Sequence, residues 1–142
     1  MGEMDNWDPY VIRTDFSDDA GWQAICAEIG SDDTEYGFVA NTQFIDDRKF
    51  ENKTPDAIRR MLGKEFEDCY GFFFVVDSVC FSSEEHPILC IKIPSKYSPN
   101  EDQFRVIPSE MWGVENNLSI SNMDFESFSG KVDEDGVLRG FD

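Results

Sequence analysis

Apolar and polar positions alternate along the chain in a way that predicts a series of short strands. Apolar stretches occupy residues 10–12, 38–46, 71–76, 88–93 and 104–107. The unbroken stretch 71–76 is typical of a strand buried on both faces, which places it centrally in a sheet. Residues 78–81 are also largely apolar, and we expect them to continue this strand or to form another strand directly after it.

Helical spacing of apolar residues predicts two main helices. In the first helix, apolar side chains recur at i, i+3, i+4 and i+7, at Trp22, Ile25, Cys26 and Ile29. Ser17 or Asp18 can cap this helix, and Gly30 suits its end. The second helix is predicted to begin after its cap Thr54 and to extend to Phe66.

The pattern changes after Pro108, where we expect two short helices. Pro108 suits the start of the first one, which carries Met111 and Trp112. Ser121 can cap the second one, with Asp124 at the capping-box position. The C-terminal part of the chain is therefore predicted to be mainly helical.

This order of elements predicts one α/β or α+β domain over residues 9–142, after an acidic N-terminal tail at residues 1–8. We expect a mixed sheet of about five strands with two main helices and short C-terminal helices. The first half can form parallel strand–helix–strand units, and the second half an antiparallel meander. The pattern does not determine the order of the strands in the sheet.

The formal net charge of −18 indicates which kinds of partner the protein could bind. Residues 1–35 contribute −9, residues 36–108 contribute −3 and residues 109–142 contribute −6. Such a charge repels nucleic acid and anionic membranes, whereas it attracts a basic protein and speeds its association. A charge that only keeps the protein dispersed in solution, or a halophilic origin, is the alternative explanation.

The cysteines and the histidine argue against several kinds of chemistry. Cys26, Cys69, Cys80 and Cys90 form no C-x-x-C pair, so a zinc or thioredoxin-type motif has no support. We expect reduced thiols and a cytoplasmic location, although Cys80 and Cys90 could face each other across a hairpin. The single histidine, His86, lies in a predicted turn without a second imidazole to share a metal. We therefore expect no metal and no cofactor.

The N-terminus shows no secretory signal, and no apolar stretch approaches the roughly 20 residues of a membrane-spanning helix. The sequence therefore predicts no membrane partner.

Three carboxylates follow the first predicted strand and form one candidate site: Asp15, Asp18 and Asp19. In open α/β sheets, ligands bind beyond the carboxyl ends of the strands, so these residues could bind a metal or a cationic group. The same residue types are also expected at the start of a helix, because they cap it and complement its dipole. The stretch DEDG at 133–136 lacks the spacing of a calcium loop.

The amide-rich stretch 113–128, GVENNLSISNMDFESF, is the second candidate site. Asparagine caps helices and bonds nearby backbone groups, so we expect Asn116–Asn117 and Ser121–Asn122 to flank short helices in a tight corner. The alternative is a polar recognition surface. Its candidate binding residues are Trp112, Glu115, Asn116, Asn117, Asn122 and Asp124.

Several stretches of the chain together carry a resemblance to a known family. They are VIRTDFSDDAGW, FVANTQFIDD, FFFVVDS, EEHPILC, FRVIPSEMWGVENNLSISNMDF and the closing DGVLRGF. Together they resemble a small bacterial domain family of unknown function, with motifs like RTDFSDD and SVENNLSxxNMDF. The resemblance covers residues 9–141, and residues 104–128 carry most of its specificity. It implies one domain and no established activity.

The charge of −18 with its acidic ends, and the lack of an assembled catalytic set, predict a non-enzymatic intracellular protein that binds a basic protein, as an immunity protein or inhibitor masks a toxin. Trp7, Tyr97 and Trp112 are candidate aromatic anchors. The alternative is a small-ligand- or metal-binding protein or an enzyme that uses a carboxylate and amide pocket. Such a pocket would lie near Asp15, Asp18, Glu115, Asn116 and Asp124. The sequence assigns no catalytic residue and does not determine the oligomeric state.

Overall fold

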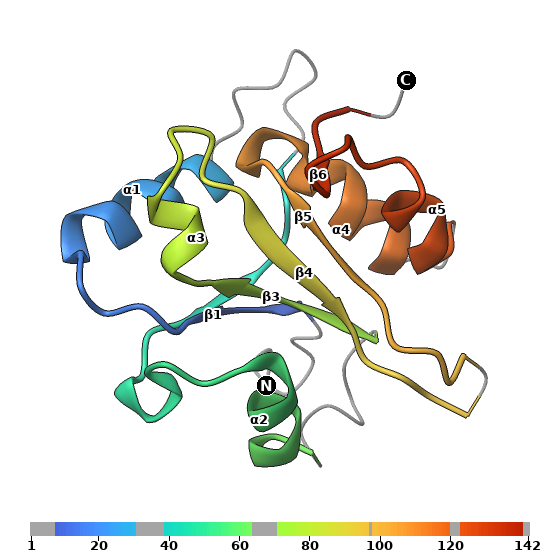
Figure 1. Ribbon diagram of the computed structural model, residues 1–142, viewed down its shortest axis with the longest axis horizontal. Helices are drawn as coiled ribbons and strands as arrows, with labels where there is room; N and C mark the ends of the chain where they lie inside the picture. The colour runs from blue at the N-terminus through green and yellow to red at the C-terminus, as the bar shows by residue number, and fades with distance from the viewer. Residues whose placement is uncertain (1–7, 31–38, 64–70, 97, 120–122, 141–142) are drawn as a thin grey trace, which may run out of the picture.

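The fold is taken from a computed structural model that describes residues 8–30, 39–63, 71–96, 98–119 and 123–140. Six strands form one mixed sheet in the order β2-β1-β3-β4-β5-β6 (Figure 1). The strands are β1 (Tyr10–Arg13), β2 (Gln43–Ile45), β3 (Phe72–Val76), β4 (Ile88–Lys92), β5 (Gln103–Val106) and β6 (Val137–Leu138).

The pairing of the strands brings most of their carboxyl ends together. β1 pairs in parallel with β2 and β3, and β6 pairs in parallel with β5. β4 is antiparallel to both of its neighbours, β3 and β5. All strands except β4 therefore run in one direction and end at the same edge of the sheet, which we call the carboxyl edge. The parallel first half and antiparallel β3–β4–β5 meander match the sequence prediction.

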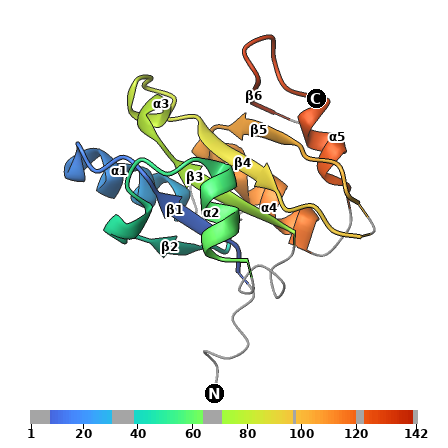
Figure 2. The same ribbon diagram turned by 60° about the horizontal axis from the view of Figure 1, so that its bottom comes forward.

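Helices cover both faces of this sheet (Figures 1 and 2). One face is covered by α1 (Asp19–Ile29), α4 (Met111–Ser119) and α5 (Phe125–Ser129), and the other by α2 (Pro55–Met61) and the 3-10 helix η2 (Arg48–Phe50). β3 supplies Phe72 and Phe74 to the first core and Phe73 and Val75 to the second. This confirms the predicted central strand that is buried on both faces.

The two main helices begin where their capping residues predict. The Asp18 carboxylate accepts a 2.8 Å hydrogen bond from the backbone N–H of Gly21 at the start of α1. The Thr54 hydroxyl accepts one of 3.2 Å from Ala57 at the start of α2. α2 ends at Met61, earlier than predicted, and residues 64–66 lie outside the described residues.

Residues Ser78–Phe81 form the short helix α3 and not a strand, so that prediction was wrong. Strand pairing stops at Val76, and Asp77 then turns its carboxylate toward Arg105 of β5, with a shortest distance of 2.7 Å. α3 stands between β3 and β4, so Cys80 and Cys90 do not face each other across a hairpin. Both are buried free thiols.

The C-terminal helices differ in detail from the prediction. After the 3-10 helix η4 (Pro108–Glu110), α4 continues through Asn116 and Asn117, so these residues lie inside a helix and do not flank one. α5 begins at Phe125 after Asp124, whereas the predicted cap Ser121 lies outside the described residues. β6 is a strand of two residues, too short for an alternating pattern to reveal. In the described part of the chain, no helix is long and apolar enough to cross a membrane.

Candidate functional site

Arg13, the last residue of β1, lies at the centre of a polar cluster on the carboxyl edge. Its side chain is almost fully buried, and its guanidinium donates to Asp19 at 2.6 Å and to Asp46 at 3.3 Å. It also donates to the backbone carbonyl of Asp15 at 3.1 Å, and the Phe16 ring centroid lies 4.4 Å from its Cζ atom. The cluster thus links the loops that follow β1 and β2, because Asp46 comes directly after β2.

The three carboxylates of the first candidate site have separate local contacts. Asp15 accepts hydrogen bonds from the backbone N–H and the hydroxyl of Ser17, at 2.8 and 2.6 Å. Asp18 caps α1, and Asp19 binds Arg13 although its own side chain is 83% exposed. In the described residues, no group of three or more His, Cys, Asp or Glu side chains is placed to hold a metal ion. The contacts therefore match the capping interpretation of Asp18.

A second cluster on the carboxyl edge surrounds Arg139, which follows β6. Its guanidinium contacts Glu85 at 2.7 Å, Asp133 at 2.9 Å and Asp135 at 2.6 Å. Glu84 and Glu134 are exposed and adjacent in sequence to these partners. We call the residues Glu84, Glu85, Asp133, Glu134 and Asp135 the acidic corner. One guanidinium neutralises only part of this charge, so the acidic corner is net negative.

Apolar surface accompanies these carboxylates. Val79 of α3 is 42% exposed at the carboxyl edge, and Phe16 is half-buried beside Arg13. Trp112 lies in the first turn of α4, close in sequence to the end of β5, and it is also half-buried. Apolar groups surrounded by charged residues are the usual composition of a protein interface.

Glu115 is a buried carboxylate that fastens α4 to the segment before β2. Its Oε1 accepts hydrogen bonds from the backbone N–H of Asn41 at 2.7 Å, from the Asn41 amide at 3.3 Å and from the Asn116 amide at 2.9 Å. Its Oε2 accepts one of 2.5 Å from the Ser119 hydroxyl. The carboxylate needs no cation because these donors replace its hydration.

The amides of the second candidate site bond the backbone. The Asn116 amide donates to the Val39 carbonyl at 3.3 Å, and the Asn117 amide donates to the Gly113 carbonyl at 2.7 Å. These contacts match the structural interpretation of the stretch. Asn122 lies outside the described residues, as do the proposed anchors Trp7 and Tyr97.

The proposed carboxylate and amide pocket is divided among three places in the fold. Asp15 and Asp18 lie at the carboxyl edge, whereas Glu115 and Asn116 bond the segment that enters β2 at its amino end. Asp124 precedes α5 and lines a different cleft, described below. No hydrogen bond between described residues joins these three groups.

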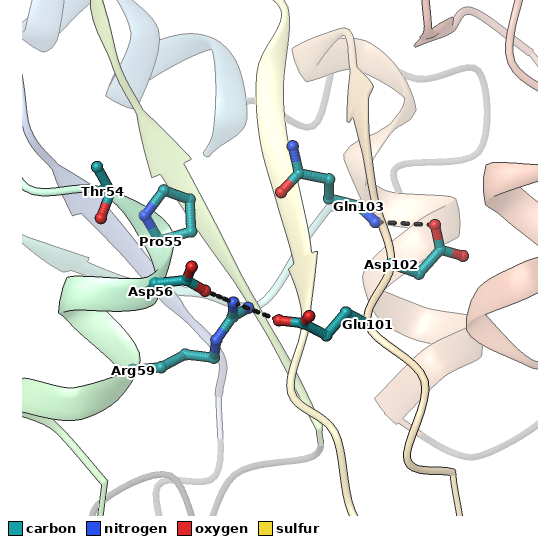
Figure 3. Close-up of a pocket in the computed structure, with 7 residues that line it drawn as sticks. All are labelled: Thr54, Pro55, Asp56, Arg59, Glu101, Asp102 and Gln103. Atoms are coloured by element: carbon teal, nitrogen blue, oxygen red, sulfur yellow. Dashed lines mark hydrogen bonds and ion pairs between the residues drawn. The ribbon is translucent and has the colours of Figure 1, made fainter.

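A cleft of about 430 Å³ lies between α2 and the segment that enters β5 (Figure 3). Arg59 extends between Asp56 and Glu101 and binds both carboxylates, with a distance of 3.1 Å to Glu101. Thr54 caps α2, and Asp102 accepts a 2.5 Å hydrogen bond from the Ser129 hydroxyl. The charged side chains of this cleft are therefore already engaged in contacts within the described chain.

Three basic residues that pair with carboxylates were not among the candidates from the sequence: Arg13, Arg139 and Lys92, which binds Glu126. Arg13 directly follows the apolar residues of β1, and Arg139 directly follows those of β6. Lys92 continues the alternation of Ile88 and Cys90 on β4, both of which belong to the core under α4 and α5. A cation at a core-type position was a visible signal for Lys92, whereas one partner of Arg139, Glu85, lies 54 positions away in the sequence.

The comparisons with known proteins identify a family and no activity. A family model described as a domain of unknown function (DUF6924) matches residues 8–141. No curated protein and no solved structure matches the chain significantly.

Proposed function

We propose a binding function from charge and geometry alone, because this chain belongs to a family, the domain of unknown function DUF6924, whose description assigns no activity. The proposed function is non-enzymatic: the carboxyl edge docks a basic protein surface, in the manner of an immunity protein or inhibitor. The main support for this proposal is that five strands end at this edge. There, more than one carboxylate binds each of Arg13 and Arg139.

Charge supports this choice of partner. Carboxylates that converge from separate segments create a local negative field, and a field of this kind steers a basic partner into contact. The arginines of the edge are already bound within the chain, so they offer little positive charge to an acidic partner. The overall charge of −18 has the same sign as this edge.

The apolar groups of the edge support a protein partner over a free cation. Val79 and Trp112 offer apolar area that a protein can bury, and Trp is a frequent hot-spot residue. An intracellular location is supported by the free thiols Cys26, Cys80 and Cys90, since reduced cysteines persist in the cytoplasm.

A labelled poly-lysine probe tests whether the acidic corner is the docking surface. The test variant Glu84→Lys/Glu134→Lys changes two exposed residues that make no hydrogen bond with described residues. The control Glu101→Lys/Asp124→Lys gives the same net charge at the opposite end of the sheet, and circular dichroism first checks its fold because Glu101 is paired with Arg59. Fluorescence anisotropy at low salt measures the binding. We expect the test variant to bind the probe several-fold more weakly than the control does. We also expect added salt to weaken the binding of the probe to the wild type.

Equal weakening in both variants would contradict the proposal, because total charge alone would then explain binding. The natural partner is sought by parallel capture on the wild type and on the Glu84→Lys/Glu134→Lys variant. A basic protein retained by the wild type only, and released by salt, is the expected result. Retention of the same proteins by both would also contradict the proposed surface.

A further inference from the structure

A second cleft, of about 430 Å³, lies at the opposite end of the sheet, between the paired ends of β3 and β4 and the helices α4 and α5. Its volume is in the range of roughly 300–1,000 Å³ that is usual for small-molecule sites. The described residues that line it are Gly71, Phe72, Lys92, Ile93, Ser95, Ser98, Leu118, Met123, Asp124, Phe125 and Glu126.

Lys92 is a buried cation at a position that the strand pattern reserves for apolar side chains. It pairs with Phe72 across β3 and β4, on the face that α4 and α5 cover. The residue is only 4% exposed, and its Nζ donates a 2.8 Å hydrogen bond to Oε2 of Glu126. A lysine ammonium has three N–H donors, and one of them is engaged by a described residue. Because Lys92 lines the cleft, its ammonium can also donate to an acceptor placed there.

Two carboxylates accompany this ammonium. The Glu126 side chain is 51% exposed, and the hydrogen bond from Lys92 lowers its pKa below the usual value. Asp124 is exposed, and its side chain makes no capping hydrogen bond to α5. Lys92 balances one of the two negative charges, so the cleft presents both an ammonium and an excess carboxylate.

The rest of the lining combines apolar side chains with two hydroxyls. Phe72 and Phe125 are buried members of the core, and Leu118 and Met123 pack against that core. Ser95 and Ser98 line the cleft from the loop after β4. A ligand with an apolar body and polar groups at one end would fit such a lining.

We propose that this cleft binds a small zwitterion with an apolar body, of the apolar α-amino acid type. The carboxylate of the ligand accepts hydrogen bonds from the ammonium of Lys92, and its ammonium donates to the carboxylates of Asp124 and Glu126. Its side chain packs against Leu118 and Met123, which are half-buried in the lining. A ligand without net charge also avoids repulsion by the charge of −18, which would oppose a simple organic anion.

Calorimetric titration with three related probes tests this assignment on the wild-type protein. The probes are L-phenylalanine, 3-phenylpropionate, which lacks the amine, and phenethylamine, which lacks the carboxylate. We expect L-phenylalanine to bind roughly tenfold or more tightly than either half-ligand, because each lost charged hydrogen bond weakens binding by about that factor. No binding of L-phenylalanine, or equal binding of phenethylamine, would overturn the proposal.

Variants then assign the two ends of the ligand. Lys92→Met keeps an apolar stem of similar length and should abolish the preference for L-phenylalanine over phenethylamine. Asp124→Asn, at an exposed position, should weaken the binding of L-phenylalanine and leave the binding of 3-phenylpropionate unchanged. This variant provides the test if Lys92→Met does not fold. Arg60→Met, an exposed change on α2, is the control. Unchanged L-phenylalanine affinity in a folded Lys92→Met or Asp124→Asn variant would contradict the assigned contacts.

The zwitterion site is independent of the proposed docking surface. Glu84→Lys/Glu134→Lys changes the opposite end of the sheet and should leave the titration with L-phenylalanine unaltered. Loss of probe binding at the acidic corner together with normal L-phenylalanine binding would therefore separate the two activities.

Discussion

The Glu115 carboxylate accepts a 2.7 Å hydrogen bond from the backbone N–H of Asn41, a residue 74 positions earlier in the chain. This contact joins the middle of α4 to the segment that leads into the edge strand β2. Because the carboxylate is buried and its partners are all neutral donors, the contact depends on complete hydrogen bonding and not on an ion pair.

Glu115→Gln should lower the free energy of unfolding by about 1–3 kcal/mol, because an amide presents an N–H toward donors that it cannot satisfy. Urea denaturation followed by circular dichroism measures this change. Glu134→Gln, at an exposed turn, is the matched control and should alter stability by less than about 0.5 kcal/mol. Equal effects of the two changes would show that the buried network contributes little.

Arg13→Lys should destabilise the fold by about 1–2 kcal/mol even though the positive charge is kept. A single ammonium cannot reproduce the planar group that contacts Asp19, Asp46 and the Asp15 carbonyl while lying over Phe16. Arg60→Lys, on the exposed side of α2, is the control for the same chemical change. Urea denaturation that gives matching midpoints and slopes for both variants would contradict this role of Arg13.

The Asp77–Arg105 pair should make stability depend on pH in the acid range. Burial alone would raise the pKa of Asp77, but the hydrogen bonds and charge of Arg105 outweigh burial and hold that pKa below the ordinary value of 3.8. Because the pKa of Asp77 is lower in the folded than in the unfolded protein, its ionised form stabilises the fold at pH values above the unfolded-state pKa. This contribution is lost as the pH falls through the folded-state pKa. Melting temperatures between about pH 6 and pH 2 measure the loss.

Asp77→Asn should reduce stability at neutral pH and flatten the acid part of this curve. Glu134→Gln is again a suitable control, since its exposed side chain makes no ion pair with described residues. An Asp77→Asn curve parallel to that of the wild type down to about pH 2 would rule out the assigned linkage.

The thiols Cys26, Cys80 and Cys90, which lie in or against the core under α1, α4 and α5, should react slowly with a disulfide reagent in the native protein. Burial raises the pKa of Cys26 to about 11 and that of Cys80 to about 12, and burial also raises the pKa of Cys90 well above its usual value. Only the thiolate attacks such a reagent. In a Cys69→Ser background, which removes the cysteine outside the described residues, we expect the three remaining thiols to react promptly only in denaturant. Rapid native labelling would contradict this expectation.

The apolar pattern predicted most of the strands and helices, because burial acts on residues that are close in sequence. The continuous apolar stretch at 71–76 identified the central strand, and Asp18 and Thr54 identified two helix starts. Residues Ser78–Phe81 misled the prediction because they are as apolar as a strand. Their helical conformation accompanies the Asp77–Arg105 contact between residues 28 positions apart, which no local pattern contains.

The candidate sites were only partly visible in the sequence. Asp15, Asp18 and Asp19 were correctly placed after the first strand, but their local partners determine what each carboxylate does. Asn116 and Asn117 were expected beside a helix and lie within one, since α4 accommodates their amides through bonds to Val39 and Gly113. The pairing of Lys92 with Glu126 required the packing of α5 on the sheet, where Phe125 and Phe128 contact Phe104 of β5.

The sequence by itself determined a mixed α/β domain, a central buried strand and a strongly acidic composition, because periodicity, capping and charge are properties of the local chain. The tertiary structure determines where that charge is concentrated. The sheet topology brings five strand ends to one edge of the sheet, and with them the carboxylates around Arg13 and Arg139. Strand order is set by long-range packing, so the same acidic residues could not be assigned to one surface from their positions in the sequence alone.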